Sequence, residues 1–276
     1  MKVIDGGVTA PKGFLAASTA AGIKYKDRSD MAMIYSTVPC KAAGTFTTNV
    51  VKAAPVLYDK KIVTESKSVQ AVVVNAGIAN ACTGAEGFGY CEDTAKKAAA
   101  ELNIAEDAVL VASTGVIGMQ LPIQKLESGI EVMAKELSDT REAAHQAACA
   151  IMTTDTISKE VAVTFEAGGK TVTVGGMCKG SGMIHPNMCT MLGFVMTDAA
   201  ISKELLQEAL SADVCDTYNM ISVDGDTSTN DTVLLLANGM AENPEITEKN
   251  EDYRKFCEAL NYVNTDCLLY TSDAAD

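Results

Sequence analysis

Apolar residues along the chain gather into short runs bounded by glycine, asparagine or aspartate, and most of these runs are rich in valine. Runs of this length and composition predict buried β-strands. The predicted strands are MAMIYS (31–36), AVVVN (71–75), AVLVAST (108–114), VAVTF (161–165), KTVTV (170–174), MLGFVMTDA (191–199) and TVLLLAN (232–238).

Other segments repeat apolar residues at helical spacing. Leu126, Ile130, Met133 and Leu137 would form one apolar face of a helix. Helices are predicted over 121–137, 140–152 and 201–220. Strands and helices mix without a regular βαβ alternation, which favours a layered α/β or α+β fold.

The overall composition fits a packed globular protein that handles small molecules. The chain has 276 residues, enough for one large domain or two modest ones. Hydrophobic residues make up 47% of it, and the formal net charge is −14. Because a negative surface repels phosphate backbones, we expect no nucleic acid as partner.

Cysteine usage and the apolar runs bear on the cellular compartment. Nine cysteines are scattered singly, with no CxxC pair. The segment MKVIDGGVTAPKG lacks the apolar run of a signal peptide, and no apolar run reaches 18 residues. We therefore expect reduced thiols in a cytoplasmic protein without a membrane partner. The two histidines lie forty residues apart and predict no zinc site.

Two motif-like segments do not fit the sites that they resemble. GGKT (168–171) ends like a phosphate-binding loop, but Thr164 stands where the first glycine belongs, so a hairpin turn is favoured. The acidic segment 224–231 begins like a calcium loop. Thr229 and Leu235, however, occupy the positions of that loop's glycine and glutamate.

The segment KGSGMIHPNMCTMLG (179–193) is rich in residues that constrain or free the backbone. Two glycines permit positive φ, and Pro186 fixes the turn before the next strand. At the start of that strand, the Thr190 Oγ can attack the carbonyl carbon of Cys189 in an N→O acyl shift. Hydrolysis of the resulting ester would free Thr190 as a new N-terminus, whose α-amine can act as general base. From these residues alone, an ordinary strand-start threonine remains the alternative.

The same segment resembles the self-cleavage segment of the ornithine acetyltransferase family, the bifunctional glutamate N-acetyltransferases of arginine biosynthesis. The family pattern is Lys-Gly-x-Gly-Met-Ile-x-Pro-Asn-Met-Ala-Thr-Met-Leu. Further matches are NAGIANACTG (75–84), VASTGVIGMQLP (111–122), AIMTTDT (150–156), TVGGMCKGSGM (173–183) and DGDTSTNDT (224–232). The resemblance extends from residue 1 to about 265, the end of its last matching segment, ALNYVNT (259–265).

The resemblance implies how the reaction would be catalysed. Thr190 would be the nucleophile that carries the acetyl group, after cleavage of the bond between Cys189 and Thr190. Thr114 and Gly115 match the family's oxyanion hole, where a hydroxyl and a backbone N–H bind the developing O⁻. Without the resemblance, these two residues would be interpreted as a strand-to-turn corner.

Two further residues match the family's substrate contacts. Lys179 matches a substrate-binding lysine, and a threonine of the TTDT pair, Thr153 in preference to Thr154, matches another substrate contact. Their sequence surroundings alone would indicate a solvated surface charge and a helix-end residue. Asn75 and Asn80 are weaker candidates for the same cleft, because asparagines beside glycine usually make turns.

The family's fold is a layered αββα-type arrangement related to N-terminal-nucleophile enzymes. Cleavage would divide the chain into an α chain (1–189) and a β chain (190–276), which would assemble as an α₂β₂ heterotetramer. The chain departs from the family in two places. Cys189 stands where the family usually has alanine, and the tail 266–276 is unlike the family, whose members continue well beyond it. The resemblance is therefore to a C-terminally truncated member.

The function that the resemblance implies is transfer of an acetyl group from N²-acetylornithine to glutamate through an acetyl-threonine intermediate. No metal and no bound cofactor are implied, although some members take the acetyl group from acetyl-CoA. The alternatives are an N-terminal-nucleophile aminopeptidase or amidase, with water as acceptor, and a catalytically inert fragment.

Overall fold

The computed structural model describes residues 1–180, 191–220 and 227–272. Its strands are β1 (Lys2–Ile4), β2 (Phe14–Thr19), β3 (Met31–Phe46), β4 (Val69–Ile78), β5 (Val109–Val116), β6 (Lys159–Ala167), β7 (Lys170–Lys179), β8 (Leu192–Thr197) and β9 (Thr232–Ala237). Its α-helices are α1 (Ala54–Glu65), α2 (Gly84–Leu102), α3 (Ile123–Glu136), α4 (Arg141–Ala150), α5 (Lys203–Asp216) and α6 (Glu251–Ser272). Short 3₁₀ turns cover Glu106–Ala108 and Tyr218–Met220.

The long strand β3 joins two parts of the sheet. The strand order is β1-β6-β7-β8-β9-β3-β4-β5, and β2 also pairs with β3. The first part of β3 pairs with β2 and β4, whereas its last part, from Lys41 onward, pairs with β9. The pairing of β3 with β4 shifts register between Tyr35 and Cys40, near Pro39, which has no N–H to donate to a ladder. This irregularity lets one strand belong to both halves.

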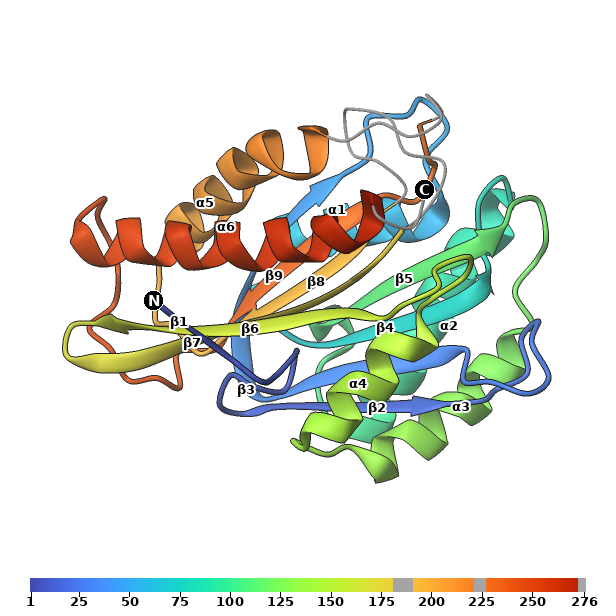
Figure 1. The fold of residues 1–276 in the computed structure, drawn as a ribbon. Coiled ribbons are helices and arrows are strands. Elements are labelled where there is room, and N and C mark those ends of the chain that lie inside the picture. The colour runs from blue at the N-terminus through green and yellow to red at the C-terminus, as the bar shows by residue number, and fades with distance from the viewer. Residues whose placement is uncertain (181–190, 221–226, 273–276) are drawn as a thin grey trace.

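The two halves of the sheet lie between layers of helices (Figure 1). One core cluster contains Phe194 and Leu234 together with residues of β2 to β5, α2, α3 and α4. The second cluster lies on the other face of β6 to β9, where Val195 and Leu235 pack with residues of α5 and α6. The alternation along β8 and β9 thus sends neighbouring side chains into different cores. These layers confirm the predicted αββα-type arrangement.

All seven predicted strands and all three predicted helices are present, and all but β3 begin and end within five residues of the predicted bounds. The strand predicted at 31–36 continues to Phe46, because its irregular stretch changes partners instead of ending. Sequence periodicity missed β1, β2, α1, α2 and α6. The predicted turn in GGKT is confirmed: Ala167 pairs with Lys170, and both intervening glycines have positive φ. Within the described ranges, no helix is long and apolar enough to span a membrane.

Candidate active site

A lysine and a threonine from different halves of the sheet meet inside the protein. The Lys179 side chain, at the end of β7, donates a hydrogen bond from Nζ to the Thr114 Oγ1 on β5, at 3.0 Å. Both residues are buried. Lysine has only donors, so Thr114 is the acceptor and its own O–H remains available to another group. The structure thus brings together two predicted site residues that lie 65 positions apart.

Gly115 follows Thr114 in a conformation that side-chain-bearing residues rarely adopt. Its φ is +133°, and a Cβ built there would lie 2.2 Å from the Gly77 carbonyl carbon on β4. The close approach requires a glycine, since any side chain would clash with backbone. Gly115 therefore fixes how β5 ends beside β4, and with it the position of Thr114.

A buried ion pair anchors the segment that contains Thr153. The Lys159 Nζ lies 2.8 Å from the Asp155 Oδ1, and both side chains are almost completely buried. The same carboxylate accepts a hydrogen bond from the Gly180 N–H at 2.7 Å, and the Thr153 N–H donates to its other oxygen at 3.3 Å. Thr153 is half-buried. Asp155 therefore ties the Thr153 segment to the residue that follows Lys179.

Two residues immediately before β9, Asn230 and Asp231, belong to the same polar cluster as Lys179 and Thr114. The Asn230 side-chain amide donates to the carbonyl oxygens of Ala79 and Ser113, at 2.6 and 2.8 Å. Asp231 accepts a hydrogen bond from the Met191 N–H at 3.1 Å. Both polar side chains are buried. They connect the ends of β4 and β5 to the start of β8.

Burial and neighbouring charges set the protonation of this cluster. Burial lowers the pKa of Lys179, an effect that Asp155 and Asp231 only partly oppose. Burial also raises the pKa of Asp231 to about 8, despite its hydrogen bond from Met191. Asp155 behaves differently: burial favours its neutral form, but Lys159 and Lys179 together lower its pKa. Asp155 is thus the ionised carboxylate beside the lysines.

Cys189 and Thr190, the predicted cleavage pair, lie outside the described residues, as does the rest of 181–190. The residues that follow Thr190 are described. Met191 carries the N–H that Asp231 accepts, and Leu192 pairs with both Lys179 and Thr232. The described chain therefore resumes at Met191, beside the strand end that carries Lys179 and next to Asp231.

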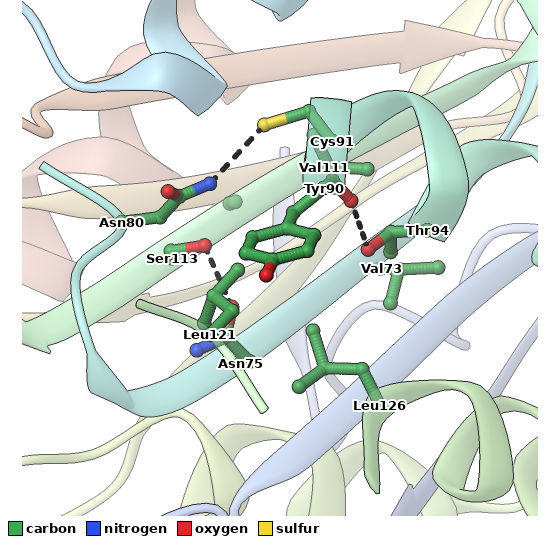
Figure 2. A pocket seen from close by; sticks show the side chains of 11 residues that line it. Val73, Asn75, Asn80, Tyr90, Cys91, Thr94, Val111, Ser113, Leu121 and Leu126 are labelled. Carbon is green, nitrogen blue, oxygen red and sulfur yellow. Dashed lines mark hydrogen bonds between the residues drawn. The ribbon is translucent and has the colours of Figure 1, made fainter. Parts of the chain in front are cut away.

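Asn75 and Asn80 line a separate, small cavity between β4, β5 and α2 (Figure 2). Asn75 accepts from the Ser113 hydroxyl at 2.6 Å, and its amide donates to Ile78. Asn80 has φ +50° and donates to Gly87, which agrees with the turn interpretation. The cavity is about 10 Å³, roughly the space of one water molecule. It is too small for a substrate.

Four residues of this cluster were not predicted from the sequence. Asp155 and Lys159 stand in and just after the TTDT segment, and their ion pair gives the segment its buried anchor. Asn230 and Asp231 stand in the acidic segment that fails as a calcium loop. The sequence contains a signal for Asn230 and Asp231, because polar residues directly before an apolar strand become buried when that strand lies in the middle of the sheet.

The layered arrangement resembles the fold of an N-terminal-nucleophile hydrolase. The l-aminopeptidase d-ala-esterase/amidase of Ochrobactrum anthropi, a new variant among the Ntn hydrolase fold, matches this chain with a TM-score of 0.57. The match covers 100% of this chain and 88% of that one. At 12% identity this likeness shows the fold alone.

The chain belongs to the ArgJ family, whose family model matches residues 15–269. It is 52% identical over 264 residues to the arginine biosynthesis bifunctional protein ArgJ of Caldanaerobacter subterraneus subsp. tengcongensis, covering 96% of this chain and 64% of that protein. It is 53% identical to the ArgJ protein of Symbiobacterium thermophilum, covering 95% and 65%. The chain thus spans a little less than two thirds of the length of these relatives.

Two solved structures of higher identity agree with this assignment. The crystal structure of ArgJ from Bacillus halodurans is 42% identical, with a TM-score of 0.64, and the match covers 68% of this chain and 96% of that one. Ornithine acetyltransferase complexed with ornithine, from Mycobacterium tuberculosis, is 41% identical, with a TM-score of 0.61 and coverages of 67% and 97%.

Proposed function

We propose that this chain carries the nucleophile and the oxyanion-binding groups of an acetyltransferase of arginine biosynthesis. The reaction is transfer of the acetyl group from N²-acetylornithine to glutamate, which gives ornithine and N-acetylglutamate. The names of the relatives and the ornithine complex of a neighbour support this substrate class. The chain spans less than two thirds of those relatives, so the complete reaction is proposed for a form extended to their length.

The observation that carries the proposal is the hydrogen bond from Lys179 to Thr114. It occupies an acceptor site of the Thr114 oxygen and leaves the hydroxyl proton for a developing oxyanion. The Lys179 ammonium also polarises that hydroxyl in a buried environment, where electrostatic stabilisation is strong. Together with the Gly115 N–H, it would form a two-donor oxyanion hole.

The nucleophile would arise by self-cleavage. The Thr190 Oγ attacks the Cys189 carbonyl carbon, and water hydrolyses the ester, freeing the Thr190 α-amine as general base. The length of a matched structure supports cleavage before Thr190. The part of this chain that is matched by the Bacillus halodurans structure is 68% of 276 residues. In number, that share is close to the 189 residues that precede Thr190, and it covers 96% of the solved chain.

In the transfer cycle, Thr190 would attack the acetyl carbonyl of N²-acetylornithine and release ornithine. The amine of glutamate would then attack the acetyl-threonine, so the two amino acids use the same site in turn. Thr153 and Lys179 would contact the substrates.

Cleavage before Thr190 gives an α chain (1–189) and a β chain that starts at residue 190. We expect these chains to form an α₂β₂ assembly in the cytoplasm. No cofactor takes part, and acetyl-CoA is an alternative acetyl donor.

A test uses a form extended to the length of the relatives. It should run as two bands on a denaturing gel, whereas Thr190→Ala should remain one band and show no transfer. Thr190→Ser keeps a hydroxyl and an amine and should retain both reactions weakly. A single wild-type band would contradict the proposal.

The fate of the acetyl group separates the transferase from a hydrolase. Incubation with N²-acetylornithine alone should give a stable acetyl adduct on the β chain, detected by intact mass, and glutamate should remove it as N-acetylglutamate. Rapid release of acetate without glutamate would favour the amidase. The absence of any adduct would favour a catalytically inert protein.

A further inference from the structure

A second group of reactive side chains lies outside the proposed acetyl-transfer site, on α4 and β6. Arg141, His145 and Cys149 recur every four residues, so they form one row along α4. Glu160 on β6 faces this row, and its side chain is 7% exposed. A thiol, an imidazole and a carboxylate thus lie in line on elements that the core holds in place.

The hydrogen bonds fix the direction of proton movement in this row. The Glu160 carboxylate accepts from the His145 Nδ1 at 2.5 Å and from the Arg141 guanidinium at 2.7 Å. A carboxylate can only accept, so Nδ1 carries the proton and the Nε2 lone pair points elsewhere. That lone pair faces the Cys149 Sγ at 3.7 Å. This order is the one that activates a nucleophile: thiol, base, and a third group that orients the base.

The thiol opens into a cavity that can hold a small molecule. The cavity has a volume of about 250 Å³ and is lined by Arg28, Ser29, Gln146, Cys149 and Met152. The Arg28 guanidinium lies 4.4 Å from the centre of the Tyr25 ring and donates to the Met152 carbonyl oxygen. Cys149 is half-buried. A cation held in place in the wall favours a ligand with a carboxylate.

We propose that Cys149 is a thiol–disulfide exchange site for small carboxylate-bearing disulfides. The Sγ–H proton passes to the His145 Nε2 while Sγ bonds to one sulfur of the reagent. The reagent's S–S bond breaks, and its other half leaves as a thiolate that takes a proton from solvent. The half that stays on Cys149 lies in the cavity, with its carboxylate near Arg28.

Cys215 provides an internal comparison. It lies exposed on α5, and its Sγ donates to the Ser211 carbonyl oxygen, which does not take up the proton. If accessibility alone governed reactivity, Cys215 would react faster than the half-buried Cys149. The proposal predicts the opposite order.

The experiment measures the rate of mixed-disulfide formation at each cysteine by peptide mass mapping at neutral pH. With dithiodipropionate, which is anionic, Cys149 should react about tenfold faster than Cys215. Cystamine has similar size but positive charge, and it should reduce this ratio severalfold. Equal rates at the two cysteines, or a ratio that is the same for both reagents, would overturn the proposal.

Two variants separate the role of His145 as the base from the role of Arg28 as the cation that binds the reagent. His145→Gln should remove the advantage of Cys149 for both reagents, and Arg28→Gln should remove only the preference for the anionic one. Glu136→Gln, exposed on α3, is the control and should change neither. Continued protection of the buried Cys91 from both reagents reports whether each variant keeps its fold. An advantage of Cys149 that survives His145→Gln in a folded variant would contradict the assigned base. The assay does not depend on acetyl transfer, so its outcome is separate from that of the proposed function.

Discussion

The Lys179 Nζ lies 3.0 Å from the Thr114 Oγ1, although β7 and β5 are separated by four other strands in the sheet order. The contact exists because the sheet turns at the irregular stretch of β3 and brings its two halves face to face. A buried cation is thereby placed against a hydroxyl whose proton is free. This pair is the structural basis of the proposed oxyanion hole.

Thr114→Val keeps the shape of the side chain but removes the hydroxyl. In the extended form, it should lower kcat about a hundredfold or more with little change in KM, because an oxyanion donor acts chiefly in the transition state. Steady-state kinetics with N²-acetylornithine and glutamate measures this. Ser113→Ala is the matched control: its hydroxyl bonds Asn75, so stability should fall and turnover should not. A rise in KM with unchanged kcat would instead assign Thr114 to ground-state binding.

Gly115→Ala should destabilise the protein by roughly 3 kcal/mol or more, because the added Cβ meets the Gly77 backbone and the positive φ is strained. Gly118→Ala is the control, since Gly118 also has positive φ but an added Cβ there has open space. It should cost only about 1–2 kcal/mol. Urea unfolding of both variants tests the difference, and equal losses would show that the contact with Gly77 relaxes freely.

Asp231 should matter for self-cleavage through its contact with Met191. Burial raises the pKa of Asp231 to about 8, so its side chain is mostly neutral at pH 7 and an amide is a close substitute. Asp231→Asn should therefore still cleave, whereas Asp231→Ala should cleave roughly a hundredfold more slowly because the Met191 amide loses its acceptor. The band pattern over time on a denaturing gel measures both rates. Equal cleavage rates for Asp231→Asn and Asp231→Ala would show that Asp231 does not position Met191 for cleavage.

Asp59 should make stability depend on pH. Its Oδ1 accepts from the Val111 N–H at 2.8 Å, and its Oδ2 has no hydrogen-bond partner in the described part of the chain. Burial raises the pKa of Asp59 well above the ordinary value of 3.8, and the Val111 hydrogen bond only partly opposes this. The folded form therefore holds the proton longer than the unfolded chain, and the wild type loses stability as pH rises above 3.8 until the folded pKa is passed.

The test compares Asp59→Asn with the wild type by urea unfolding from pH 4 to pH 8. The variant keeps the acceptor for Val111 but has no proton to lose, so it should be more stable by at least about 1 kcal/mol at pH 8. The difference should shrink toward pH 4. The exposed Asp93→Asn controls for removal of one negative charge. A difference between Asp59→Asn and wild type that stays constant with pH would contradict a raised pKa.

The sequence by itself determined the central strands, three helices and several residues of the candidate site. Strand signals are local, because valine-rich runs such as 71–75 are buried on both faces and need no partner to be recognised. Motif resemblance likewise singled out Thr114, Gly115 and Lys179. Helices α2 and α6 gave no clear signal, because many of their positions are alanine or polar and the apolar stripe is narrow.

Only the tertiary structure decided what these residues touch. The sequence neighbours of Lys179 indicate a solvated charge, yet Lys179 is buried against Thr114 and close to Asp155 and Asp231. Hydrogen bonds between residues far apart in the chain leave no periodic trace, so no local pattern could reveal them. Such charges become tolerable in the interior only when folding supplies their partners, and the partners here come from separate strands and loops.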